Sequence, residues 1–207
     1  MKRALLISLF CTSVFFAFAQ SNPDPKIFAA DEIVWAGLDF SEARLIGSEG
    51  FSDPYDIKDR FFNSWNNLIL AESDKYNVRE FYQKSKVIND LSVVNERNET
   101  PDPDELVINE SYSLDQGTIA SMVKSYDLEK KDEGVGLVYI VESFDKTGVM
   151  ATVDVVFFDI RTKEILWQEQ YHEKPGGFGL RNYWAGAIMK VMKGSKEDYE
   201  KAKQKSK

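Results

Sequence analysis

Three strand-like runs in the carboxy-terminal half, joined by two short turns, constrain the fold of this chain most strongly. The runs cover residues 135–144, 149–160 and 165–172. Turns of four residues connect neighbouring strands only in the antiparallel sense, because parallel strands need a long crossover. In the middle run, Val153 and Val156 place apolar groups on opposite faces, as expected of a strand that lies inside a sheet. The pattern predicts an antiparallel meander.

Helical sequence patterns flank this meander. Asp53 and Pro54 form a typical helix start, because the aspartate accepts from free backbone amides and proline needs no amide there. Ser113 and Gln116 form a capping-box pattern at a second start. Gly194 is a typical helix stop. The expected helices cover residues 54–73, a segment from Ser113 to about Tyr126, and residues 180–193.

A single α+β domain over residues 31–194 accounts for these elements. Short apolar runs at 32–39 and 87–94 are expected to add strands to the meander. Helices and strands do not alternate strictly, which favours a mostly antiparallel sheet with helices packed on it. Residues 195–207 carry five lysines against three acidic residues and are expected to form a separate charged helix or tail.

The first nineteen residues have the order of a secretory signal peptide. Lys2 and Arg3 precede an almost wholly apolar run that closes on Ala17-Phe18-Ala19, and this predicts export with cleavage before Gln20. The run is too short for a membrane-spanning helix. Residues 20–30 are then a flexible leader. The alternative is a lipoprotein anchored through Cys11, in which an apolar segment would remain beside the anchor.

Charge and cysteine content exclude several classes of function. Removal of Lys2 and Arg3 from the 26 basic residues leaves 24 against 34 acidic ones, a net charge of −10 for the mature chain. Such a surface repels nucleic acid and anionic lipid. Cys11 is the only cysteine, so the cleaved chain has no disulfide, thiol nucleophile or cysteine metal site. We therefore expect neither a metal nor a cofactor, and no transmembrane segment after cleavage.

A glycine-rich stretch, GGFGLRNYWAG from Gly176, resembles a phosphate-binding loop in part. Gly177 and Gly179 fit two positions of a dinucleotide-binding loop, but Asn182 stands where its third small residue belongs. What remains is a helix amino terminus with Arg181 beside it, a candidate anion site. The alternative, which we favour, is a tight structural corner made possible by small residues.

The sole histidine and a few acidic residues are the other candidates. His172 has no nucleophilic serine motif to serve, so it is expected to be an exposed strand residue. Glu142 and Asp154 interrupt two apolar strands that a hairpin makes neighbours, and a register that pairs residue 145 with 149 puts both on one face. Two such acids could act in hydrolysis. Asp39 is a third candidate, or else the cap of the following turn.

Several segments resemble a family of small exported Bacteroidetes proteins that has no assigned activity. They are WAGLDF from Trp35, LIGSEGF from Leu45, DLSVV from Asp90 and the glycine-rich stretch already described. More faintly, residues 159–167 are similar to a hairpin in the periplasmic α/β domains of curli-secretion and penicillin-binding-protein-activator lipoproteins. Lys163 stands where that hairpin has glycine. The resemblance implies an envelope location and supplies no catalytic residues.

Two functions follow from these patterns. The first is a non-catalytic periplasmic or secreted protein that binds an unknown ligand or assists an envelope protein. The second is a hydrolase of envelope polysaccharide or peptide that uses Glu142, Asp154 or Asp39. The first is favoured because few elements of a catalytic site are present.

Overall fold

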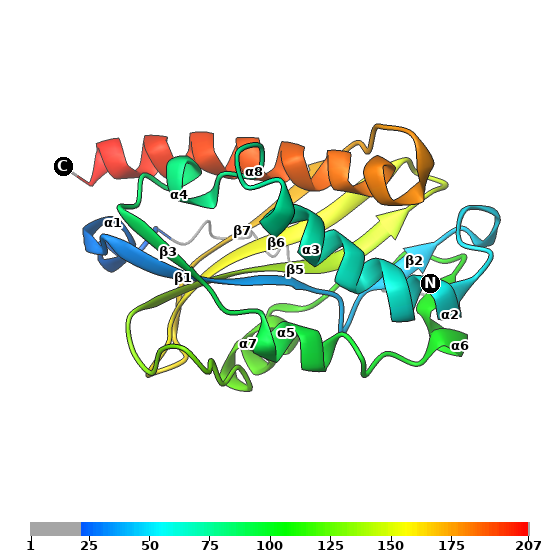
Figure 1. Cartoon of the computed structure of the whole chain (residues 1–207), viewed down its shortest axis with the longest axis horizontal. Helices are drawn as coiled ribbons and strands as arrows, with labels where there is room; N and C mark the ends of the chain where they lie inside the picture. Colours follow the sequence, from blue (N-terminus) through cyan, green and yellow to red (C-terminus); the bar gives the residue numbers. More distant parts are fainter. Residues whose placement is uncertain (1–21, 207) are drawn as a thin grey trace, which may run out of the picture.

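The strand β5 (Val135–Asp145) is the centre of the sheet, and all of its residues except the last are buried. The computed structural model describes residues 22–206, and Figure 1 shows helices on both sides of this sheet. The predicted signal peptide, with Cys11, lies outside the described residues.

The described residues form seven strands and several helices. The strands are β1 (Glu32–Asp39), β2 (Arg44–Ile46), β3 (Lys86–Asn89), β4 (Val107–Ile108), β5, β6 (Met150–Asp159) and β7 (Ile165–Glu173). The helices are α1 (Lys26–Ala29), α2 (Pro54–Asp56), α3 (Phe62–Ala71), α4 (Val78–Phe81), α5 (Ser92–Arg97), α6 (Pro103–Leu106), α7 (Gln116–Lys124) and α8 (Gly179–Lys205). A 3-10 turn, η1 (Ser48–Gly50), and a π-helical turn, η2 (Ile57–Phe61), complete them.

The sheet is mixed, with its parallel strands on one side of β5. One edge of β5 is occupied along its whole length by β6, antiparallel, and β7 extends β6. The other edge pairs first with β1 and then with β2, both parallel. Outside them, β3 pairs with β1 and β4 with β2, again parallel. The strands β3, β1, β5, β2 and β4 therefore all run the same way.

The predicted fold class, a mostly antiparallel α+β sheet, is wrong: the protein has an α/β fold. The expected meander is present as β5–β6–β7, and β6 lies between two partners. The error came from the amino-terminal half. Its strands pair with partners far away in the chain, and helices separate β2 from β3 and β3 from β4. Such pairing leaves no short-turn signal in the sequence.

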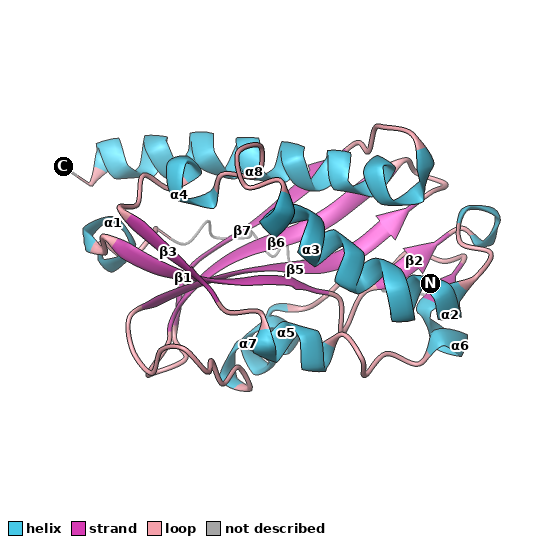
Figure 2. Ribbon diagram, in the orientation of Figure 1, coloured by secondary structure: helices cyan, strands magenta, loops and turns pink. Residues whose placement is uncertain are grey.

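Two helical layers cover the sheet unequally. Figure 2 shows α3, α4 and the long helix α8 over one face and α5 and α7 over the other. The first face is strongly aromatic: Phe144 stacks on Trp184 with ring centroids 4.5 Å apart, and Trp35 meets Tyr139 edge-on at 5.0 Å. All four tryptophans are buried, as expected of core residues.

Local signals located most helices but misplaced some boundaries. Asp53 caps the segment α2–η2–α3 by accepting from Asp56 N at 3.0 Å, which confirms the predicted helix over most of its length. Asp115, and not Ser113, caps α7. The strand predicted over 87–94 stops at Asn89, because Asp90 accepts from Ser92 and a helix follows.

Both ends of the described chain belong to the packed domain. In the expected flexible leader, Ile27 is buried and Lys84 donates to its carbonyl at 2.5 Å. The prediction that Gly194 ends a helix is also wrong, since α8 continues to Lys205. Ser195 and Tyr199 are fully buried and continue its apolar stripe, so tertiary packing overrides the glycine.

The glycine-rich stretch makes a close-packed corner between β7 and α8. Gly177 and Gly179 have φ of +128° and +75°, values that favour glycine. A Cβ on Gly186 would lie 2.1 Å from the carbonyl oxygen of Gly176. The helix thus rests against its own preceding turn at a distance that only glycine permits.

Substitution at this contact should be costly despite a gain in helix propensity. Gly186→Ala is expected to lower the free energy of unfolding by about 1–3 kcal/mol, as overpacking does, in urea denaturation. Gly176→Ala is the control, because its Cβ would meet no atom within 4 Å and little change is expected. Equal stability of Gly186→Ala and the wild type would contradict this packing.

Candidate functional site

Glu142 and Asp154 converge on one face of the sheet. The pairing differs from the predicted register: Asp145 lies opposite Met150, and the register shifts at Glu142. This extra residue is a β-bulge, which re-aims side chains within a strand. Gln170 on β7 donates from its Nε2 to Glu142 Oε2 and to Asp154 Oδ2, each at 3.1 Å. Because both oxygens lie 3.1 Å from the same nitrogen, the distance between them is at most twice that value.

The surroundings of this acid pair disfavour negative charge. Both side chains are buried, although Gln170 above them is exposed. Burial raises the pKa of Glu142, and the negative charge of Asp154 raises it further. A hydrogen bond from Leu114 N acts in the opposite direction and lowers this pKa. Burial likewise raises the pKa of Asp154, against hydrogen bonds from Gln168 and Gln170. Each of these acids therefore keeps its proton to a higher pH than an exposed carboxylic acid of the same type does.

His172 lies on the same face but is not bonded to either acid. It is exposed on β7, and its Nδ1 lies 3.1 Å from Thr152 Oγ1. Its charge favours the ionised forms of Glu142 and Asp154. The arrangement offers acid–base groups and one imidazole beside them.

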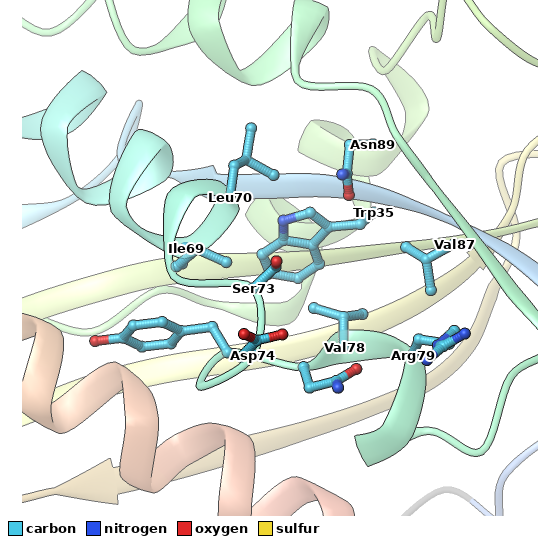
Figure 3. A pocket seen from close by; sticks show the side chains of 11 residues that line it. Trp35, Ile69, Leu70, Ser73, Asp74, Val78, Arg79, Val87 and Asn89 are labelled. Carbon is cyan, nitrogen blue, oxygen red and sulfur yellow. The ribbon is translucent and has the colours of Figure 1, made fainter.

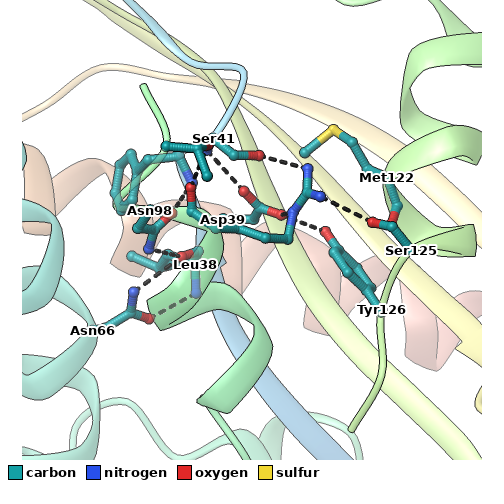
Figure 4. Close-up of polar contacts among 11 residues, drawn as sticks. Leu38, Asp39, Ser41, Asn66, Asn98, Met122, Ser125 and Tyr126 are labelled. Carbon is teal, nitrogen blue, oxygen red and sulfur yellow. Dashed lines mark hydrogen bonds and ion pairs between the residues drawn. The ribbon is translucent and has the colours of Figure 1, made fainter. Parts of the chain in front are cut away.

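Asp39 belongs to a separate buried network at the carboxyl end of β1. Figure 4 shows Asp39 between Ser41 and Tyr126, and Arg97 also donates to its carboxylate. Its Oδ2 accepts from Arg97 Nε at 2.8 Å and from Tyr126 Oη at 2.7 Å, and its Oδ1 accepts from Ser41 N at 2.8 Å. Burial raises the pKa of Tyr126 well above its usual value, and Asp39 adds to this effect.

This network joins three separate segments of the chain. Arg97 is the last residue of α5 and also donates to Ser41 Oγ and Ser125 Oγ. The predicted turn-capping role of Asp39 is confirmed by its bond to Ser41 N. Because the protein's own donors occupy both carboxylate oxygens, Asp39 is a structural residue and does not join the other two acids.

The predicted anion-site residues do not meet the acids either. The carbonyl oxygen of Arg181 accepts from Trp65 Nε1 at 2.8 Å, and its guanidinium bonds Asn182 at 3.3 Å. Its side chain borders a shallow hollow of about 400 Å³ along α3, with residues such as Asp59 and Asn63. Neither Gly177 nor Gly179 borders this hollow or the acid pair.

A pocket of about 270 Å³ lies under α3 and α4, on the face of the sheet opposite the acid pair. It is lined by the end of α3, the turn that follows, the start of α4, and the strands β1 and β3; its residues are Trp35, Ile69, Leu70, Ser73, Asp74, Tyr76, Asn77, Val78, Arg79, Val87 and Asn89. Figure 3 shows the Trp35 indole at its centre, with the ring nitrogen toward Leu70 and Asn89. We call this cavity the Trp35 pocket.

The indole of Trp35 is the distinctive group of this pocket. Its Nε1 is buried and has no hydrogen-bond partner among the described residues. By contrast, Trp65 donates to a carbonyl and Trp167 to Glu169. Trp184 shares the lack of a partner but lies outside the pocket. A buried donor without an acceptor costs about 1–3 kcal/mol.

Sequence reasoning did not identify the pocket or the asparagines that support β1. Asn66 pairs with both backbone groups of Leu38, at 2.7 and 2.9 Å, and Asn98 accepts from Phe40 N at 2.6 Å. These bonds replace sheet pairing where the chain leaves β1. The available signal was an asparagine inside a strongly apolar helix, where its propensity is poor.

The comparisons with known proteins give no match, either to a protein-family model or to a curated protein. No helix within residues 22–206 is both long and apolar enough to cross a membrane. In the same range, no group of three or more histidine, cysteine or acidic side chains is placed to hold a metal ion.

The raised pKa values of the acid pair predict a pH-dependent stability. A folded-state pKa above the unfolded value stabilises the protein below about pH 4, and this contribution is lost as the pH rises through the folded-state values. Glu142→Gln removes one charge and keeps an acceptor for Leu114. It is therefore expected to raise the free energy of unfolding at pH 7 but to change it little at pH 4.

Urea denaturation at the two pH values measures this difference. Glu164→Gln, at the exposed turn between β6 and β7, is the control and should show no comparable difference. A loss of stability of Glu142→Gln at pH 7 would mean that the ionised pair stabilises the fold.

Proposed function

We propose that this chain is an exported, non-catalytic protein of the cell envelope, periplasmic or secreted, that binds a small ligand in the Trp35 pocket. The proposal of export rests on the signal-peptide pattern of residues 1–19. The resemblance to exported Bacteroidetes proteins agrees with it. A role as an accessory to an envelope protein is compatible with ligand binding.

The observation that carries the proposal is the unpaired indole N–H of Trp35 at a pocket with apolar walls. Ligand sites are typically concave and mostly apolar, with few polar groups that fix orientation. Here the apolar surface comes from residues such as Ile69, Val78 and Val87, and the rim carries polar side chains. Buried polar groups almost always have a partner, so the orphan donor favours a site that an external acceptor completes.

Hydrolysis is the second candidate, and the convergence of Glu142 and Asp154 favours it. Two carboxyl groups at short separation can serve as acid and nucleophile. Neither acid, however, borders either of the two pockets described above. Both acids also accept from the same side chain, Gln170. Release of fragments from envelope polysaccharide by the wild type, but not by a Glu142→Gln, Asp154→Asn double variant, would establish this function instead.

Binding to the pocket can be tested with a matched pair of tryptophan variants. Trp35→Phe removes the N–H donor in the pocket, and Trp184→Phe removes the other unpaired indole N–H outside it. A screen of small polar and amphipathic metabolites by thermal shift should give ligands for the wild type. Trp35→Phe is expected to weaken their binding about three- to tenfold, the worth of one hydrogen bond.

The control variant Trp184→Phe should bind these ligands as tightly as the wild type. Two results would overturn the proposal: a screen that yields no ligand, or ligands whose affinity falls equally in both variants. Fractionation of the native cells, with the protein found only in the cytoplasm, would overturn its export.

A further inference from the structure

We infer that the ligand of the Trp35 pocket is a small zwitterion with an apolar body, of the size of a free amino acid or a dipeptide. This inference rests on the proposed function and specifies the chemistry of the ligand. It follows from three features of the pocket: its size, the charges at its rim and the position of its buried donor.

Size limits the ligand to a small molecule. Sites for drug-sized compounds usually enclose about 300–1,000 Å³, and this pocket has about 270 Å³. Its deepest residues, Trp35, Ile69 and Tyr76, are buried, and Leu70 and Val87 are half-buried above them. An aliphatic side chain of a few carbon atoms would lie against these residues.

The rim carries one charge of each sign. Asp74 and Arg79 are the charged residues among those that line the pocket, and both are exposed. Figure 3 shows them on either side of Val78. Within residues 22–206, neither side chain forms an ion pair, although the neighbouring Lys75 pairs with Glu72. An ammonium group would be attracted to Asp74, and a carboxylate to the guanidinium of Arg79.

The neutral polar groups favour the same ligand. Ser73, Asn77 and Asn89 also line the pocket and supply both donors and acceptors. The Trp35 N–H lacks an acceptor, and a peptide carbonyl oxygen or the carboxylate oxygen not held by Arg79 can provide one. A purely apolar ligand would leave that donor unpaired, and a singly charged one would leave one rim charge without a partner.

A set of four probes separates the contributions of the two charges. L-Leucine and the dipeptide Leu-Leu carry both charges, isocaproate only the carboxylate, and isopentylamine only the ammonium group. Binding is measured by calorimetry or by NMR titration. We expect one of the two zwitterions to bind at least threefold more tightly than either singly charged analogue. The tighter of the two distinguishes a free amino acid from a peptide.

Two exposed substitutions assign each charge. Asp74→Asn should weaken leucine and isopentylamine about threefold and leave isocaproate unchanged, as for a partly exposed ion pair. Arg79→Gln should weaken leucine and isocaproate and leave the amine unchanged. Asp127→Asn and Lys124→Gln are the controls, because these exposed residues lie outside the pocket and should change nothing.

Four outcomes overturn the inference. Equal binding of the zwitterions and the singly charged analogues, or indifference of binding to both rim substitutions, would assign the pocket to apolar ligands. Failure of all four probes, while the metabolite screen yields a ligand sensitive to Trp35→Phe, would reject the zwitterion but retain the proposed function. Failure of the probes together with that screen rejects both.

Discussion

Backbone pairing along both edges of β5 is the constraint on which the rest of the structure depends. One edge takes β6 over its whole length, and the other takes β1 and then β2, with a break at residues 40–43. Because β5 is buried on both faces, each face needs its own helical cover. The break leaves backbone groups without strand partners. Asn98 accepts from Phe40 N in this break, Asn66 pairs with Leu38 beyond the end of β3, and Asp39 accepts from Ser41 N in the turn that follows.

The two faces of the sheet differ in the polar groups that are buried under their helices. The face under α3, α4 and α8 is strongly aromatic, and two of its buried donors, the indole N–H groups of Trp35 and Trp184, lack a partner among the described residues. The face under α5 and α7 contains buried charge, but Arg97 and the amides of Gln168 and Gln170 hydrogen-bond to its acids. The fold's own donors thus hold the buried acids, whereas the Trp35 N–H beside its pocket has no such partner. This contrast is why the Trp35 pocket carries our functional proposal.

The sequence predicted those features of the fold that depend on residues close together in the chain. The hairpins after β5 and β6, the helix that Asp53 starts, and the burial of the tryptophans all follow from neighbouring residues. The parallel pairing of β1 with β3 and β5 could not be predicted from the sequence, because it joins segments that are separated by dozens of residues. The convergence of Glu142 and Asp154 was foreseen in outline, but it depends on a bulge that leaves no composition signal. The Trp35 pocket was missed because its walls come from several separate segments.

The indole N–H resonances of the four tryptophans test the central claim most directly. In a ¹⁵N–¹H spectrum assigned with single Trp→Phe variants, titration with a ligand of the pocket should move the Trp35 signal downfield, as a new hydrogen bond forms. The Trp184 signal, from the other unpaired indole, should stay in place. A Trp35 signal that does not move at saturation, or that moves no more than that of Trp184, would contradict the claim that this donor is kept for a ligand.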